Sequence, residues 1–201
     1  GQFSLERANR ITQQIASALS AAHANGIIHE NLSSDNIFLS HAADGADFVK
    51  VLDFGAFRPD EEQALAFDEA ARRVEYLAPE QTSDGAADED IDARADIYSL
   101  GVILYEMLAG EVPFAGENAA EVRLKHEQEP PPPLAAFRND LPGDVEQIVL
   151  RALAKIPENR YRNAGEFADA LNRATVFATR FDSGGNAIPA EALAGADRRQ
   201  N

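Results

Sequence analysis

The side chains able to do chemistry gather in two short stretches of the sequence. One stretch lies near residue 30 and the other at Asp53, and together they supply His29, Glu30, Asn31, Ser33, Asn36 and Asp53. An amide such as Asn31 accepts a hydrogen bond, but it is not a useful base at neutral pH. Asn36 and Asp53 offer oxygen ligands suited to Mg²⁺, an ion that gives up its water reluctantly and normally depends on phosphate oxygens. We therefore expect these groups alone to hold no stable metal and no cofactor.

Residue types elsewhere exclude several other kinds of site. The chain has no cysteine, which excludes a thiol nucleophile, a disulfide and a cysteine metal site. No two histidines are four residues apart on a predicted helix, so we expect no histidine metal site among His23, His29, His41 and His126.

Charge and hydropathy narrow the class of protein. The formal net charge of −16 argues against nonspecific nucleic-acid binding, which needs basic patches. Between Ala56 and Asp96 we count 13 acidic residues and four arginines, a net charge of −9. This segment predicts a solvated acidic surface or, alternatively, a docking surface for a basic partner. The sequence has no long apolar run and no signal-peptide pattern at its start, so we expect a cytoplasmic location without membrane contact by this segment.

The elements that must position these groups are mostly helical. Apolar residues at helical spacing predict a helix over Ser4–Asn25, capped by Ser4 and ended at Gly26. Apolar runs at Ile37–Ser40 and Phe48–Leu52 predict a small hairpin. The segment Ala95–Leu108 is apolar nearly all round, which predicts a helix at the centre of the core.

The second half of the chain continues this helical pattern. Further helices are predicted over Asn118–Gln128, Asp144–Leu153 and Ala164–Arg173. The pattern fades after Thr175, so we expect one domain over residues 1–175 and a tail or linker over 176–201.

Five short motifs occur in one order along the chain. Residues 27–37 read IIHENLSSDNI, Asp53-Phe54-Gly55 ends the predicted hairpin, and Ala78-Pro79-Glu80 follows. DIYSLG stands at residues 96–101 and PENRY at residues 157–161. Each motif alone is weak evidence, but in this order they resemble the C-terminal lobe of a eukaryotic-type protein kinase, in the style of the bacterial Ser/Thr kinases. The resemblance covers residues 4–173.

The resemblance implies a fold and a set of structural roles. The expected fold class is mainly α, a kinase C-lobe-like helical domain with a small β-hairpin, and the N-lobe is absent from these 201 residues because no glycine-rich loop or lysine-bearing strand occurs in them. By resemblance, Phe38 would be a vestigial adenine floor, and Asn36 and Asp53 would be vestigial metal ligands. The residues expected to hold the lobe together are His29 under Phe54, Gly55, Asp96 on the catalytic-loop amides, and a buried ion pair of Glu80 with Arg160.

Departures from the family pattern fall on the chemistry. Asn31 stands at the position of the aspartate that accepts the substrate hydroxyl's proton, and Ser33 stands at the position of a lysine that stabilises the transferring phosphoryl group. Glu30 replaces an arginine that in many kinases binds a phosphate on the activation loop, and residues 56–75 contain no Ser, Thr or Tyr to carry one. Arg72 and Arg73 stand where a Gly-Thr pair is usual.

We therefore expect no catalytic residue here and a pseudokinase lobe rather than an enzyme, acting as a protein-binding or scaffold module. The expected partner is a protein or a second copy, bound through the face that an N-lobe normally covers. The alternative is a C-lobe fragment of a longer or split Ser/Thr protein kinase-like protein that binds nucleotide only together with an N-lobe.

Overall fold

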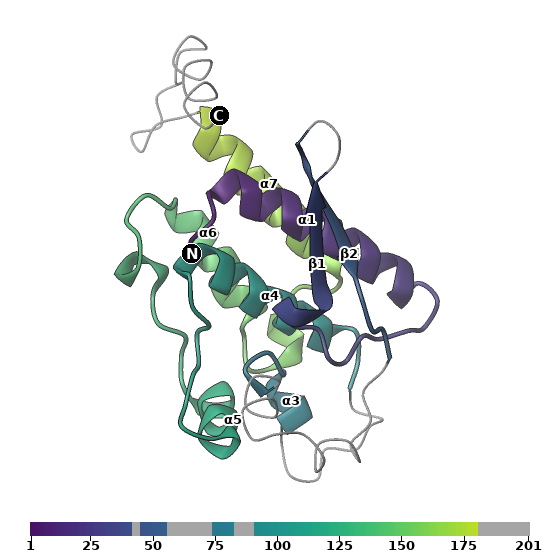
Figure 1. Ribbon diagram of the computed structural model, residues 1–201. Helices are drawn as coiled ribbons and strands as arrows, with labels where there is room; N and C mark the ends of the chain where they lie inside the picture. Colours follow the sequence, from purple (N-terminus) through teal and green to yellow (C-terminus); the bar gives the residue numbers. More distant parts are fainter. Residues whose placement is uncertain (42–44, 56–73, 83–90, 181–201) are drawn as a thin grey trace.

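A computed structural model describes residues 1–41, 45–55, 74–82 and 91–180 of the chain (Figure 1). The predicted polar segment with Arg72 and Arg73, most of the acidic stretch, and residues 181–201 lie outside the described residues. The helices are α1 (Leu5–His23), α3 (Pro79–Thr82), α4 (Arg94–Ala109), α5 (Ala119–Gln128), α6 (Gly143–Ala152) and α7 (Ala164–Arg180). Short 3-10 turns occupy Ser34–Asn36, Leu134–Ala136 and Pro157–Asn159, and the strands are β1 (Ile37–His41) and β2 (Asp47–Val51). The fold is thus mainly helical with one antiparallel hairpin, as the sequence predicts.

Helix α4 forms the centre of the core. Nearly all of its residues are buried, including the polar Asp96 and Ser99, because the helix is apolar on every side. It packs against α1, α6 and α7, which lie around it in Figure 1. The helix ends where Gly110 adopts a left-handed backbone with φ 88°, a conformation that glycine adopts without steric cost.

Helices α1 and α7 lie along one another and support the hairpin. The Ser4 side chain caps α1 by accepting a hydrogen bond from the Arg7 amide at 3.3 Å. On the side facing the hairpin, the Gln14 side chain accepts from the Val49 amide and donates to the Asp47 carbonyl, each at 3.0 Å. The Gln14 side chain therefore hydrogen-bonds β2 along its edge and joins the hairpin to α1.

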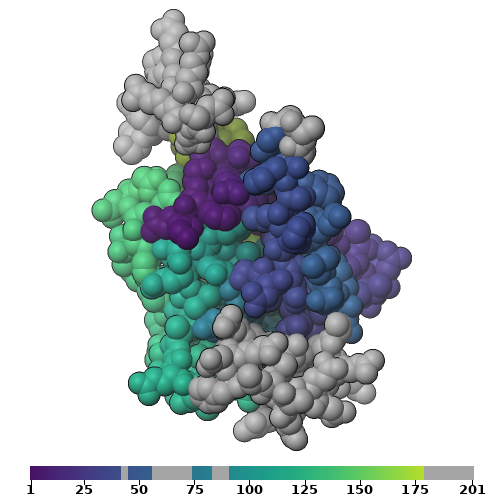
Figure 2. Space-filling view, viewed as in Figure 1, coloured from purple at the N-terminus to yellow at the C-terminus, as the bar shows by residue number. Residues whose placement is uncertain are grey.

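The hairpin has one face against the core and one toward solvent. In the register, Ile37 pairs with Val51 and Leu39 with Val49, and these four side chains pack on the core. The alternate residues point the other way, since successive side chains of a strand face opposite sides. Phe38 is 56% exposed and Phe48 is 51% exposed, and the hairpin lies at the molecular surface in Figure 2. The hairpin thus presents an aromatic outer face in this chain.

The last helix is longer than the predicted range Ala164–Arg173. Helix α7 continues to Arg180, and Ala174, Thr175 and Ala178 still pack on or near the core. No glycine or proline interrupts residues 166–180, so the helical ladder continues beyond the point at which large apolar residues become sparse.

None of the helices in the described ranges combines the length and the apolar composition that crossing a membrane requires.

Candidate functional site

The loop that carries Asn31 is fixed by one carboxylate from the core. Asp96 is 1% exposed and accepts hydrogen bonds from the His29 amide at 2.9 Å and the Glu30 amide at 3.0 Å. The His23 Nε2 atom donates to the same carboxylate at 2.7 Å. Asp96 lies inside α4, whose N-cap is Ala93, so Asp96 binds the loop and does not cap its own helix. Three hydrogen bonds therefore satisfy a buried charge and fix the loop.

A second set of hydrogen bonds ties this loop to the strand end that carries Asp53. His29 Nε2 donates to the Leu52 carbonyl, and the Leu52 amide donates to the Asn36 carbonyl, each at 2.9 Å. The His29 ring also lies 4.7 Å from the Phe54 ring, between centroids. The structure thus brings the histidine of the first motif together with the Asp53-Phe54-Gly55 motif.

Asn36 and Asp53 form the part of the site best suited to a cation. Asn36 Nδ2 donates to the Asn31 carbonyl at 2.8 Å, which leaves Asn36 Oδ1 as its ligand-capable atom. Asp53 directly follows Leu52, so its exposed carboxylate lies on the chain segment bonded to Asn36. A carboxylate and an amide oxygen fit Mg²⁺ in kind, provided that phosphates supply further oxygens. Within the described part of the chain, no three His, Cys, Asp or Glu side chains form a metal-binding group.

Backbone strain marks both halves of this site. Glu30 has φ 64° and Asp53 has φ 60°, and these are the two described non-glycine residues with positive φ. Left-handed backbone is unfavourable for such residues and persists where surrounding contacts impose it. Here the imposed geometry orients Glu30, which precedes Asn31, and Asp53, which is itself a candidate cation ligand.

Two of the substituted positions, Asn31 and Ser33, bring neither a positive charge nor a base to this loop. Ser33 is buried, at 8% exposure, whereas Asn31 and Glu30 are half-buried. A serine hydroxyl is neutral and short, and an amide does not take up a proton at neutral pH. The loop keeps its hydrogen-bonded backbone, whereas the side chains of Asn31 and Ser33 differ from the aspartate and the lysine that the family resemblance implies at these positions.

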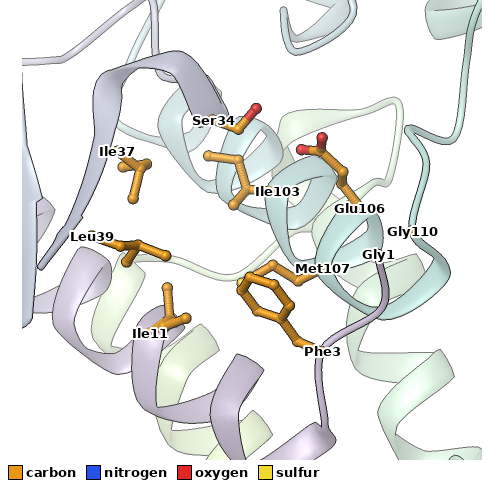
Figure 3. Close-up of a pocket in the computed structure, with 10 residues that line it drawn as sticks. All are labelled: Gly1, Phe3, Ile11, Ser34, Ile37, Leu39, Ile103, Glu106, Met107 and Gly110. Atoms are coloured by element: carbon orange, nitrogen blue, oxygen red, sulfur yellow. The ribbon is translucent and has the colours of Figure 1, made fainter. Parts of the chain in front are cut away.

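A hydroxyl network lies beside the loop, and two of its members, Ser34 and Glu106, line a cavity of about 250 Å³ (Figure 3). Ser34 Oγ donates to Tyr76 OH at 2.7 Å, and Tyr76 OH donates to Glu106 Oε2 at 2.8 Å. Burial raises the pKa of Tyr76, so the phenol keeps its proton and acts as a donor to Glu106. The cavity wall is otherwise largely apolar, with Ile11, Ile37, Leu39, Ile103 and Met107 among its lining residues.

The ion pair of Glu80 with Arg160 anchors the segment 74–82 to the end of the domain. Both terminal nitrogens of Arg160 reach the Glu80 carboxylate, at 2.6 and 2.7 Å. Arg160 also donates to three backbone carbonyls, those of Ala154, Lys155 and Arg94. The guanidinium is therefore fully engaged although it is buried.

Sequence reasoning missed four side chains that complete this region, namely His23, Tyr76, Gln81 and Glu106. Each is a common polar residue whose type signals nothing alone. The one sequence signal that could have pointed to any of them is the position of Gln81 directly after the Ala78-Pro79-Glu80 motif.

The fold and these motifs define a member of an enzyme family. The family model described as "Protein kinase domain" matches residues 1–172, and the chain belongs to this family. Serine/threonine-protein kinase Pkn1 of Myxococcus xanthus is 41% identical over 80% of this chain and 23% of its own length. Serine/threonine-protein kinase PknB of Mycobacterium tuberculosis is 39% identical over 86% of this chain and 27% of its own length.

A solved structure shows the same fold. The kinase domain of Mycobacterium tuberculosis PknI is 29% identical, with a TM-score of 0.64, over 87% of this chain and 57% of that chain. The chain thus spans about a quarter of the curated relatives and little more than half of a solved kinase domain.

These relatives correct one expectation from the sequence. We expected a protein that is not an enzyme, and this is wrong at the level of family, because relatives 38–41% identical over most of the chain are named Ser/Thr protein kinases. The substitutions at Asn31 and Ser33 change single side chains, whereas the five motifs and their order along the chain are those of an enzyme family.

Proposed function

We propose that this chain is the C-terminal lobe of a Ser/Thr protein kinase-like protein, and that it holds a magnesium nucleotide together with an N-terminal lobe on the same or another polypeptide. The observation that carries the proposal is the hydrogen bonding that links Asn31, Asn36 and Leu52, the residue before Asp53, at the base of the hairpin. Phe38 lies on the outer face of the same hairpin, where the family resemblance puts the adenine ring.

In this proposal Asn36 Oδ1 and the Asp53 carboxylate would be ligands of the cation, and the cation would neutralise charge on the nucleotide phosphates. The reaction is the transfer of a phosphoryl group to a serine or threonine hydroxyl of a protein. Asn31 accepts the hydrogen bond of that hydroxyl and orients it, but its amide cannot take the proton. Ser33 supplies no charge to the transferring group, and the loss of such a charge typically costs about 2 to 4 kcal/mol of transition-state stabilisation. We therefore propose a slow phosphotransferase.

The variant Asn31→Asp tests this function in a protein that contains both lobes. An ionised carboxylate restores a base beside the hydroxyl, and general-base catalysis contributes about 10²-fold or more. We expect the phosphorylation rate of a Ser/Thr peptide to rise at least tenfold, because Ser33 still limits the rate. The measurement is single-turnover transfer of labelled phosphate from Mg-ATP. The control is Asn139→Asp, a change of the same type in a surface loop outside the site.

Two outcomes would count against the proposal. One is the absence of Mg-ATP binding in a calorimetric titration of the two-lobe protein. The other is binding that is unaffected by Asp53→Asn, since the carboxylate is then not part of the cation site.

A second candidate function concerns the outer face of the hairpin, where Phe38, Phe48 and Leu52 are exposed. We propose that this face is a protein interface and that its principal occupant is the N-terminal lobe. Large exposed aromatic side chains on one side of a sheet support this proposal, since such patches tend to be covered in the working protein. A second copy of the chain is the competing occupant.

A further inference from the structure

The backbone of Glu30, the residue that precedes Asn31, is held at both its amide and its carbonyl. The Glu30 amide donates to Asp96 Oδ1 at 3.0 Å, and the Glu30 carbonyl accepts from Gln81 Nε2 at 2.7 Å. Glu30 has a left-handed backbone, which is unfavourable for a residue with a side chain and must be stabilised by its surroundings. Because Asp96 fixes only the amide, the orientation of the Glu30 carbonyl depends on Gln81.

The same glutamine makes a second contact on its other side. Gln81 Oε1 accepts a hydrogen bond from the Ala78 amide at 3.0 Å. Gln81 therefore joins the start of α3 to a loop that lies 51 positions earlier in the sequence. Its amide uses a donor and an acceptor at once, which a glutamate or a methionine of similar length cannot do.

The two sides of Asn31 are fixed by different side chains. Before it, Gln81 fixes the Glu30 carbonyl, and after it, Asn36 Nδ2 donates to the carbonyl of Asn31 at 2.8 Å. The direction in which the Asn31 side chain leaves the loop follows from these two anchors.

We infer that Gln81 is a positioning residue, which sets the orientation of Asn31 and couples it to the segment 74–82. If that segment moved, the Ala78 amide would shift the Gln81 side chain to which it is hydrogen-bonded. The Gln81 side chain would in turn change the orientation of the Glu30 carbonyl. The segment is itself tied to the loop by the Ser34–Tyr76–Glu106 network, so the loop and the segment are linked at two points. The chemical consequence of this inference rests on the proposed function, whereas the coupling itself does not.

Amide hydrogen exchange in the 201-residue chain tests the coupling without any assay of activity. In Gln81→Met both contacts are lost, so the Ala78 amide loses its acceptor, and the Glu30 backbone, no longer held at its carbonyl, can turn and weaken the bond of its amide to Asp96. We therefore expect the amides of Glu30 and Ala78 to exchange at least tenfold faster. In Gln81→Glu the acceptor for the Ala78 amide remains while the donor to the Glu30 carbonyl is lost. Only the Glu30 amide, whose bond to Asp96 then lies on a loosened backbone, is expected to exchange faster.

Gln13→Met is the matched control. Gln13 also donates to a backbone carbonyl, that of Ala168 at 2.6 Å, but it joins α1 to α7 away from the loop. This variant is expected to lower the melting temperature and to leave both reporter amides unchanged relative to neighbouring core amides. Unchanged exchange of Glu30 in both Gln81 variants would overturn the inference, as would an equal change in the control.

The kinetic arm uses the two-lobe protein in the Asn31→Asp background. We expect Gln81→Met to lower kcat at least tenfold with little change in the KM for Mg-ATP, and Gln13→Met to leave both unchanged. Faster exchange with an unchanged kcat would overturn the positioning role. If Asn31→Asp shows no transfer at all, the proposed function fails, and the exchange experiment still decides whether Gln81 couples the two segments.

Discussion

Arg160 is the largest fully buried side chain in the described part of the molecule, and it carries a charge. Its guanidinium has five hydrogen bonds, two to Glu80 and three to backbone carbonyls. The guanidinium also lies 4.9 Å from the centre of the Tyr98 ring. Such a group is tolerated in a core only because every donor has a partner.

Replacing Arg160 by alanine should destabilise the domain strongly. The change leaves the Glu80 carboxylate without its partner and strands three carbonyls, and breaking a buried ion pair in this way costs about 3 to 5 kcal/mol. Urea unfolding followed by circular dichroism measures the loss. Lys125→Ala, which removes a surface pair with Glu121, is the control and should change stability little. An unchanged midpoint in Arg160→Ala would contradict the structural role.

His126 makes the stability of the domain sensitive to acid. Its ring is fully buried, with Nδ1 against the Tyr98 hydroxyl at 2.8 Å and the Phe114 ring 4.8 Å away. Burial, reinforced by the charge of nearby Lys155, lowers the pKa of His126 to about 3. Burial and the neighbouring Arg160 also lower the pKa of Lys155, to about 8. The folded state therefore holds His126 neutral where the unfolded chain would protonate it.

The sign of the pH effect follows from this difference. The folded pKa lies below the unfolded value of about 6.5, so the contribution is complete above that pH and is lost as the pH falls toward 3. Between pH 7 and pH 5 we expect His126 to account for a loss of about 2 kcal/mol. In His126→Asn this part of the slope should disappear in urea titrations at several pH values. His41→Asn, at an exposed histidine, should retain it.

At the scale of elements, α4 approaches α6 closely at Gly101. Gly101 lies in α4, and a Cβ atom added there would stand 2.9 Å from the Ala152 Cβ and 3.2 Å from the Leu153 side chain. Glycine at this position lets the central helix approach α6 more closely than any other residue would allow.

Gly101→Ala should therefore destabilise the protein although alanine is the better helix former. Overpacking of a core typically costs about 1 to 3 kcal/mol, which exceeds the helix-propensity gain of about 1 kcal/mol. Gly143→Ala is the matched control, since Gly143 begins α6 with no atom within 4 Å of an added Cβ. The measurement is the melting temperature of both variants in thermal unfolding. An increase in the melting temperature of Gly101→Ala would refute the close contact.

At the scale of the whole molecule, the outer hairpin face is the place where a second lobe would add to the core. Phe48→Ser should lower the melting temperature of a two-lobe protein by more than that of the 201-residue chain, in which Phe48 is already half exposed. Burying such a side chain contributes about 1 to 2 kcal/mol. Phe177→Ser, at a 54% exposed residue of α7, should affect both proteins alike. Equal effects of Phe48→Ser on the two proteins would mean that the N-terminal lobe does not cover this face, and sedimentation would then test for a second copy.

The sequence by itself determined the parts of this protein that depend on near neighbours. The periodicity of apolar residues predicts the hairpin around Leu39 and the helices around Ile15, Leu104 and Val149. The helix ends at Ser4 and Gly110 depend on hydrogen bonds to residues only a few positions away. The order of motifs also led to the kinase family. It did not settle enzyme status, because the substitutions at Glu30, Asn31 and Ser33 change single groups while the ordered motifs keep the family pattern.

The tertiary structure decided which polar groups meet. Asp96 binds the Glu30 amide across 66 positions of the sequence, and Gln81 binds the Glu30 carbonyl across 51. Neither bond is predictable from nearby residues, because both depend on how α3 and α4 pack against the loop. Contacts within one element follow from the spacing of residues along the chain, whereas contacts between elements follow from packing, which spacing does not specify.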